Sequence, residues 1–342
     1  MAIPGGSADL LVLTNGSSFM LRRSFLAASA ATLALVSTTA LAQSPRQITL
    51  THSSPANSHF GLAAITFKEV VEKESNGRYR VVIQRLDNER EALESVQLGS
   101  QEFSMGSTGP VGNFVPAVRA LDVPFIFRDY AHARGVVDGK IGQDMLKDFT
   151  RRNIVGLAFM ENGFRHLTTG GKLVEKPEDV KGLKIRTMEN PVHMSAWRAA
   201  GVLPTPMAFS ELPPALQQGT VDGQENPIPV ILSNNFNQLQ KYLYLTGHVY
   251  SAGLLAGSQT FWTTLNEGDR KIFQNAARAA VKTNRDKVEA DERDGVAELR
   301  RRGMDVREVA NRASYQEAMK SAMPDFERQF GADLLKAIRD QK

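Results

Sequence analysis

Short apolar strand patterns alternate with amphipathic helix patterns from residue 47 onward, and this order restricts the fold more than any other feature of the chain. Strand patterns at 47–51, 79–83 and 102–105 are separated by helix patterns at 58–75 and 88–98. A strand–helix–strand order requires a mostly parallel sheet with helices on its faces. The sequence therefore predicts an α/β protein whose ligands bind beyond the carboxyl ends of the strands.

The rest of the chain continues this pattern and contains one very long helix pattern at 267–301. At about 1.5 Å per residue it would span roughly 50 Å, so we expect it to brace two domains. Two helices with a break near 291–294 are the alternative interpretation. Further strand patterns lie at 154–159, 183–188, 242–246 and 249–256, and further helix patterns lie at 131–137, 141–152, 191–200, 211–218 and 314–330.

The length of the chain favours two domains, because most domains contain roughly 100–150 residues. We expect the first domain to comprise residues 43–162 and 252–291. The second domain is then formed by residues 163–251 and 292–342.

Residues 1–42 have the composition of an export signal. Arg22 and Arg23 precede an apolar run at 25–41, and the run ends in small residues suited to cleavage after Ala42. The run is too short and too polar for a membrane span, so we expect a periplasmic protein with a cleaved leader. Met20 is a second candidate for the start codon. The paired arginines also resemble the twin-arginine signal, although the ordinary secretory route is the commoner case.

Composition excludes several classes of function. The chain has no cysteine, which rules out thiol catalysis and Cys-ligated metals, and its six histidines lack metal-binding spacing. No nucleophile elbow or phosphate-binding loop occurs, and no basic run is interleaved with aromatics as nucleic-acid binding would require. We therefore expect no metal, cofactor or nucleic acid. The net charge of +4 weakly favours anionic partners.

Arg186 is the central candidate for ligand binding. It lies in the strand pattern at 183–188, which is bounded by Gly182 and Pro191. A guanidinium is permanently charged and matches a carboxylate with two parallel hydrogen bonds. We infer that Arg186 binds the carboxylate of a small organic acid. A solvated surface arginine is the alternative interpretation.

Other polar residues lie where strands end. Arg165 follows the strand pattern at 154–159, and Asn226 precedes a proline, which favours extended backbone and leaves its amide free to point at a ligand. The remaining candidates at or near strand ends are His52, Glu89, Ser107 and Thr108.

Three segments resemble the solute receptors of TRAP (tripartite ATP-independent periplasmic) transporters. They are DVKGLKIR at 179–186, TPMAFSE at 205–211 and ALQQGTVDGQENP at 215–227. The resemblance covers nearly all of the chain after the leader. It implies a periplasmic-binding-protein-like fold, with two α/β domains around a ligand cleft and a long helix spanning both. It also implies a receptor that delivers an organic acid to a TRAP membrane permease.

The resemblance assigns roles to individual residues. Arg186 matches the arginine of the family that binds the ligand carboxylate, and Arg165 matches a second arginine near the same group. Asn226 matches a ligand-binding asparagine, and Phe209 matches an aromatic residue that lines the cleft.

His52, Glu89 and Ser107 fall where the family carries variable polar groups that set specificity. The segment at 82–90 is a few residues shorter than is usual in the family and lacks its proline, which puts the position of Glu89 in question.

Three functions are compatible with the sequence. The first is a monomeric receptor for a sugar acid such as a uronate, or for a C4-dicarboxylate. Because Glu89 is an acceptor that suits hydroxyls and repels a second carboxylate, we favour the sugar acid. The second is an enzyme of organic acids with His52 and Glu89 as acid and base, although the sequence lacks a nucleophile with an oriented base. The third is a ligand-sensing subunit for a signalling partner.

Overall fold

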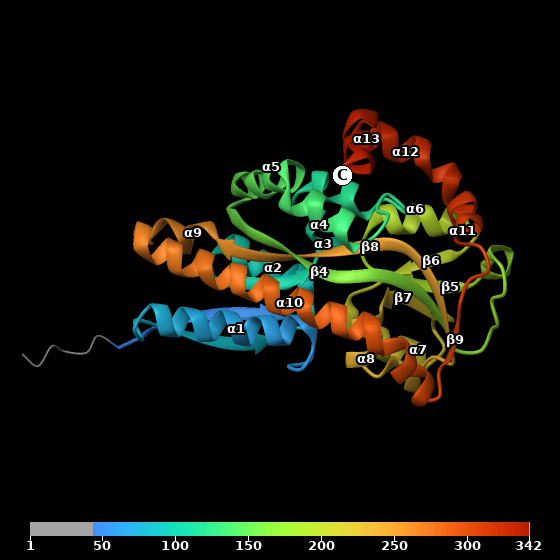
Figure 1. Ribbon diagram of the computed structural model, residues 1–342, viewed down its shortest axis with the longest axis horizontal. Coiled ribbons are helices and arrows are strands. Elements are labelled where there is room, and N and C mark those ends of the chain that lie inside the picture. Colours follow the sequence, from blue (N-terminus) through green and yellow to red (C-terminus); the bar gives the residue numbers. More distant parts are fainter. Residues whose placement is uncertain (1–43, 342) are drawn as a thin grey trace, which may run out of the picture. The chain divides into compact units, whose positions relative to one another are not determined.

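The computed structural model describes residues 44–341, so the predicted leader and its cleavage after Ala42 lie outside the described residues. In the described part, the strands form one mixed sheet in the order β2-β1-β3-β8-β4-β7-β5-β6, and β9 pairs with β8 (Figure 1). The strands are β1 (Arg46–His52), β2 (Tyr79–Arg85), β3 (Phe103–Ser107), β4 (Ile154–Thr169), β5 (Lys184–Thr187), β6 (Leu203–Pro206), β7 (Gly223–Pro227), β8 (Tyr242–Ser258) and β9 (Asp305–Arg307).

The helices lie between and after these strands. They are α1 (His59–Glu74), α2 (Glu89–Leu98), α3 (Thr108–Val111), α4 (Tyr130–Asp138), α5 (Lys140–Asp148), α6 (Pro191–Ala199), α7 (Leu212–Gln217), α8 (Ile228–Ser233), α9 (Gln259–Thr263), α10 (Glu267–Arg301), α11 (Arg312–Met319), α12 (Met323–Phe330) and α13 (Ala332–Asp340). Short 3₁₀ helices, such as η1 (Pro116–Asp122) and η4 (Phe209–Glu211), occupy several of the connections.

The sheet is divided into two lobes that share its two longest strands. The first lobe contains β1, β2 and β3, which pair in parallel with one another. The second contains β5, β6 and β7, which are also parallel. Strands β4 and β8 run antiparallel along nearly their whole length and belong to both lobes. This confirms the predicted α/β fold with two lobes, whereas the exact domain boundaries stay a prediction.

Polar caps explain where several helices begin and end. The Ser58 hydroxyl accepts a hydrogen bond from the Gly61 N–H at the start of α1. The Asn88 and Asn266 side chains accept hydrogen bonds from backbone N–H groups in the same way at the starts of α2 and α10. Gly99 ends α2 in the left-handed conformation that glycine adopts without strain. These local signals account for the close agreement between predicted and observed bounds.

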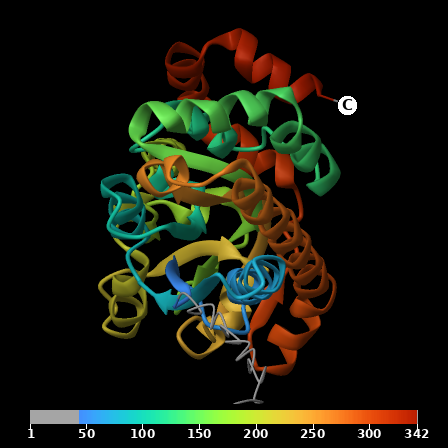
Figure 2. The ribbon, with the colours of Figure 1, turned by 90° about the vertical axis from the view of Figure 1, so that its left-hand side faces the viewer.

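Helices cover both faces of the sheet (Figure 2). On one face α1 and α10 pack side by side, and the aromatic rings of Phe67, Phe103 and Phe273 meet in a core beneath them. On the other face α4, α5, α6 and the C-terminal helices bury a second and larger core that includes Phe149, Trp197 and Phe326. Burial of these apolar side chains is the main force that holds the layers together.

Four interpretations of the sequence were wrong in detail. The strand patterns at 242–246 and 249–256 form the single strand β8, and the strand predicted at 154–159 continues to Thr169. The helix predicted at 314–330 is broken into α11 and α12, and α13 follows. The long helix α10 is continuous, so the interpretation as two helices is also wrong.

The crossing between the lobes has an unusual backbone. Strand β4 carries a register shift between Glu161 and Gly163, and Gly163 has a φ of +120°. A Cβ at this position would lie 2.9 Å from the Cβ of Pro227, so only glycine fits. The Asn284 side chain on α10 bonds both the N–H and the carbonyl of the buried Glu161. The long helix is therefore attached to the strand at the crossing.

The described residues contain neither a candidate membrane-spanning helix nor a candidate metal site. None of the helices in residues 44–341 is both long and apolar enough to cross a membrane. In the same residues, no group of three or more His, Asp or Glu side chains is arranged to hold a metal ion.

Glu292 on α10 should make stability depend on pH. Burial raises its pKa from 4.5 to about 7. Its neutral form is therefore favoured in the folded state, and this contribution to stability is lost as pH rises from about 4.5 through 7. We expect Glu292→Gln to flatten this slope and to raise the free energy of unfolding at pH 8 by up to roughly 3 kcal/mol.

Urea denaturation at pH 5 and pH 8 measures the effect. The exposed Glu308→Gln is the matched control and should keep the wild-type slope. Identical slopes for Glu292→Gln and the wild type would contradict the prediction.

Candidate functional site

A cavity lies between the two lobes, at the carboxyl ends of their parallel strands. The first lobe contributes Ser53, Glu89, Ser107 and Asn162 to its wall. The second lobe contributes Arg186, Met207, Phe209 and Asn226. The cavity has a volume of about 30 Å³, which is room for one or two water molecules. An organic acid with four or more carbons therefore requires the lobes to separate or the side chains to move.

Arg186 lies in β5 and turns its guanidinium toward the cavity wall. Its Nε and Nη2 donate to the carbonyl oxygen of Met207 at 3.2 and 2.8 Å, and the ring of Phe209 lies 5.8 Å from its Cζ. Its Nη1 is buried without a partner among the described residues. Burial, and then the charge of Arg165, lower the pKa of Arg186 to about 10, so the group is a cation at neutral pH.

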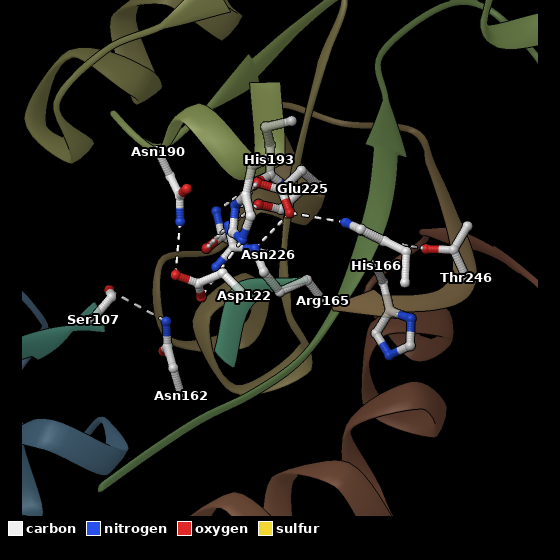
Figure 3. A network of polar contacts seen from close by, with 12 residues as sticks. Ser107, Asp122, Asn162, Arg165, His166, Asn190, His193, Glu225, Asn226 and Thr246 are labelled. Carbon is white, nitrogen blue, oxygen red and sulfur yellow. Dashed lines mark hydrogen bonds and ion pairs between the residues drawn. The ribbon is translucent and has the colours of Figure 1, made fainter. Parts of the chain in front are cut away.

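Arg165 in β4 is fully buried and pairs with Glu225 in β7. Its Nε lies 2.5 Å from Oε2 of Glu225, and its Nη2 lies 2.9 Å from Oε1. Nη2 also donates to Oδ1 of Asn226 at 3.1 Å (Figure 3). Arg165 itself does not line the cavity. It lies behind Asn226 and holds the amide of that residue at the cavity wall.

The Glu225 carboxylate is the centre of a buried polar network (Figure 3). Its Oε2 lies 3.0 Å from Nε2 of His248, whose Nδ1 lies 2.8 Å from the Thr246 hydroxyl. Burial alone would raise the pKa of Glu225, but the charge of Arg165 and the hydrogen bond of His248 hold it well below its usual value. Glu225 therefore stays ionised and balances the charge of Arg165.

Glu89 begins α2 and faces the cavity from the first lobe. Its Oε1 accepts hydrogen bonds from the Ser53 hydroxyl, the Ser107 N–H and the Ser107 hydroxyl at 3.0, 3.1 and 3.2 Å. Burial raises the pKa of Glu89, whereas these hydrogen bonds and the charge of Arg186 oppose the shift. The shorter segment at 82–90 thus leaves Glu89 at the cavity.

The structure does not bring all the candidate residues together. Glu89, Ser107, Arg186, Phe209 and Asn226 line the cavity. The other three candidates, His52, Thr108 and Arg165, do not.

Thr108 donates its hydroxyl hydrogen to the carbonyl of Ala252 at 3.0 Å, which is a bond within the first lobe. His52 is buried, and its pKa is lowered mainly by that burial. An acid–base pair of His52 and Glu89 would need both side chains at the cavity.

Sequence reasoning missed several residues of this site. Ser53 directly follows His52, so the end of β1 was a usable signal for it. Asn162 lies in the part of β4 that was not predicted to be strand. Met207 contributes a backbone carbonyl, and a carbonyl leaves no trace in the sequence. Glu225 was passed over because its role depends on the pairing of β4 with β7.

Comparisons with known proteins agree on one family. The model for "Bacterial extracellular solute-binding protein, family 7" matches residues 50–329. A solute-binding protein of Verminephrobacter eiseniae is 48% identical over 304 residues, which cover 88% of this chain and 90% of that protein.

Solved structures give the same result. A TRAP periplasmic solute-binding protein from Polaromonas sp. JS666, bound to D-erythronate, has a TM-score of 0.85 and 48% identity. A second one, from Bordetella bronchiseptica, has a TM-score of 0.85 and 43% identity, and its ligand density was assigned as pantoate. Each match covers 87% of this chain and 99% of the other. The chain therefore belongs to family 7 of the bacterial extracellular solute-binding proteins, which are receptors of TRAP transporters.

Proposed function

We propose that the protein is a periplasmic receptor for a small hydroxylated monocarboxylate, which it delivers to a TRAP membrane permease. The family consists of transport receptors, and two of the similar structures hold a ligand of this chemical class, D-erythronate in one and a ligand assigned as pantoate in the other. The proposed form is a monomer, exported by cleavage after Ala42, that releases its ligand unchanged.

The observation that carries the proposal is the distribution of charge around the cavity. The positive charge of Arg165 is balanced by Glu225 at hydrogen-bond distance. Arg186 makes hydrogen bonds only to a neutral carbonyl and has no carboxylate partner among the described residues.

Glu89 is the carboxylate on the opposite wall that makes no ion pair among the described residues, whereas Glu189 lies 3.8 Å from Arg90. Arg90, a second arginine of the wall, also lies 3.2 Å from Glu94. Arg186 is thus the lining arginine without a carboxylate partner among the described residues, and it suits one ligand carboxylate.

Magnitudes favour hydroxyls over a second carboxylate. A second carboxylate about 4 Å from Glu89 would be repelled by roughly 4 kcal/mol at an effective dielectric constant of about 20. A hydroxyl at the same place donates a hydrogen bond to a charged acceptor, which contributes roughly 1.5–3 kcal/mol. A bidentate bond from Arg186 contributes a similar amount. Micromolar affinity requires about 8 kcal/mol in total, so groups from both lobes must take part.

Because the ligand groups come from both lobes, the closed form makes contacts that an open form lacks. A ligand shifts a conformational equilibrium only through such a difference in affinity. In the proposed cycle, closure over the acid creates the shape that the permease recognises.

A panel of acids tests the proposed function. In a thermal-shift experiment, D-erythronate should raise the melting temperature of the wild type, because a ligand that binds only the folded state stabilises it. Succinate at the same concentration should have little effect. Glu89→Gln removes the negative charge, so we expect about tenfold weaker binding of D-erythronate and a gain for succinate relative to it.

The exposed Glu91→Gln on the same helix is the matched control and should leave both responses unchanged. Stronger stabilisation of the wild type by succinate than by D-erythronate would contradict the proposed ligand class.

Arg186→Lys tests the carboxylate-binding group. Lysine keeps the charge but loses the planar fork. The affinity for D-erythronate, measured by calorimetry, should fall at least about tenfold while the circular dichroism spectrum stays that of the folded protein. Arg198→Lys, an exposed change in the same lobe, should bind as the wild type does. Unchanged affinity would remove Arg186 from the proposed role.

A further inference from the structure

The two oxygens of the Glu89 carboxylate have different surroundings. Within the described part of the chain, all hydrogen bonds to this carboxylate fall on Oε1, which accepts from Ser53 and twice from Ser107. A carboxylate oxygen accepts about two hydrogen bonds along its lone pairs, so Oε1 is saturated. Oε2 is therefore the oxygen that remains to accept a hydrogen bond from a ligand.

A chain of hydrogen bonds continues behind Ser107 into the core of the first lobe. Nδ2 of Asn162 donates to the Ser107 hydroxyl oxygen at 3.4 Å (Figure 3). Oδ1 of Asn162 lies 3.0 Å from Nε2 of His59. Asn162 and His59 are 2% and 0% exposed, so bulk water has little access to these bonds, although Asn162 also lines the cavity.

The known donors fix which atom donates and which accepts in each of these hydrogen bonds. Because the amide of Asn162 donates to Ser107, its Oδ1 must accept, and Nε2 of His59 must carry the proton. Burial lowers the pKa of His59 to about 4, so the ring is neutral at pH 7 with this single tautomer. The Ser107 oxygen accepts from Asn162 and thus turns its own proton toward Glu89.

We propose that Asn162 is a positioning residue, oriented by His59, that keeps the Ser107 hydroxyl donating to Glu89 and so leaves Oε2 of Glu89 as the acceptor for a ligand hydroxyl. The inference rests on the proposed function, because an acceptor at this place serves only a ligand that bears hydroxyl groups. It assigns the selection of hydroxylated acids to a chain of four residues: His59, Asn162, Ser107 and Glu89.

A double-mutant cycle tests the inference. Asn162→Asp keeps the size of the side chain but replaces its donor with an acceptor, so the Ser107 proton turns away from Glu89. We expect calorimetric affinity for D-erythronate to fall at least about tenfold in the wild-type background. In the Glu89→Gln background the same change should cost at most about threefold, because the group through which Asn162 acts has been removed.

Two control variants separate the hydrogen-bond chain from charge and packing. Asn162→Leu removes both hydrogen bonds with little change in volume and leaves the Ser107 hydroxyl free to rotate, so we expect a loss of about threefold, between the wild type and Asn162→Asp. Asn88→Asp adds the same charge at the edge of the cavity but outside the chain. In the wild-type background it gives the loss that an added charge causes without a change in the Ser107 hydrogen bond, and this loss should be smaller than that of Asn162→Asp.

An equal loss for Asn162→Asp in both backgrounds would overturn the inference, since Asn162 would then act on the ligand directly. So would an Asn162→Leu variant that binds as tightly as the wild type, since the Ser107 hydroxyl would then not need Asn162. If Asn162→Asp does not fold, His59→Phe takes its place in the cycle, with His59→Gln expected to restore binding. A wild-type protein that binds no hydroxylated acid would overturn the proposed function, and this inference with it.

Discussion

The buried ion pair between Arg165 and Glu225 is the interaction on which the proposed binding site depends. Both side chains are fully buried, and an unpaired charge in such a place would cost several kcal/mol. Their mutual neutralisation lets the chain bury a second arginine, Arg186, nearby without a carboxylate of its own. The second lobe therefore presents a single uncompensated cation to the cavity.

The first lobe presents the complementary surface. Its polar groups converge on one oxygen of Glu89, so an acceptor faces the cation across the cavity. A ligand with a carboxylate at one end and hydroxyls along the rest satisfies both walls at once. A hydrocarbon acid or a second carboxylate would leave one wall unsatisfied, which is how a site selects against the wrong ligand. Selectivity in this arrangement arises from both lobes together.

Local sequence was enough to predict many of the helix and strand positions. It was not enough to predict many of the residues of the site. Caps such as Ser58, Asn88 and Asn266 act within one turn of their helix, so the helix bounds were predictable. Asn162 was missed because β4 is buried on both faces beyond residue 159, and a buried strand shows no alternation of polar and apolar residues. Glu225 meets Arg165 only through the register of β4 and β7, which a single sequence does not reveal. The roles of Arg186 and Asn226 were inferred from local sequence and also from resemblance, whereas that of Arg165 came from resemblance. All three remain to be tested by binding.

Strands β4 and β8 pass side by side from one lobe into the other, and this pairing has a mechanical consequence. Two antiparallel strands run from one lobe into the other, and the register shift beside Gly163 lies where they cross. A single flexible linker would let the lobes tumble in any direction, but a paired ribbon permits chiefly a twist and a bend about its own axis. A rotation of a few degrees there moves the distant rims of the lobes by several times the displacement at the pivot. In the proposed cycle, we infer that this ribbon converts a small rotation at the crossing into a larger displacement at the rims, which is the change that the permease would distinguish.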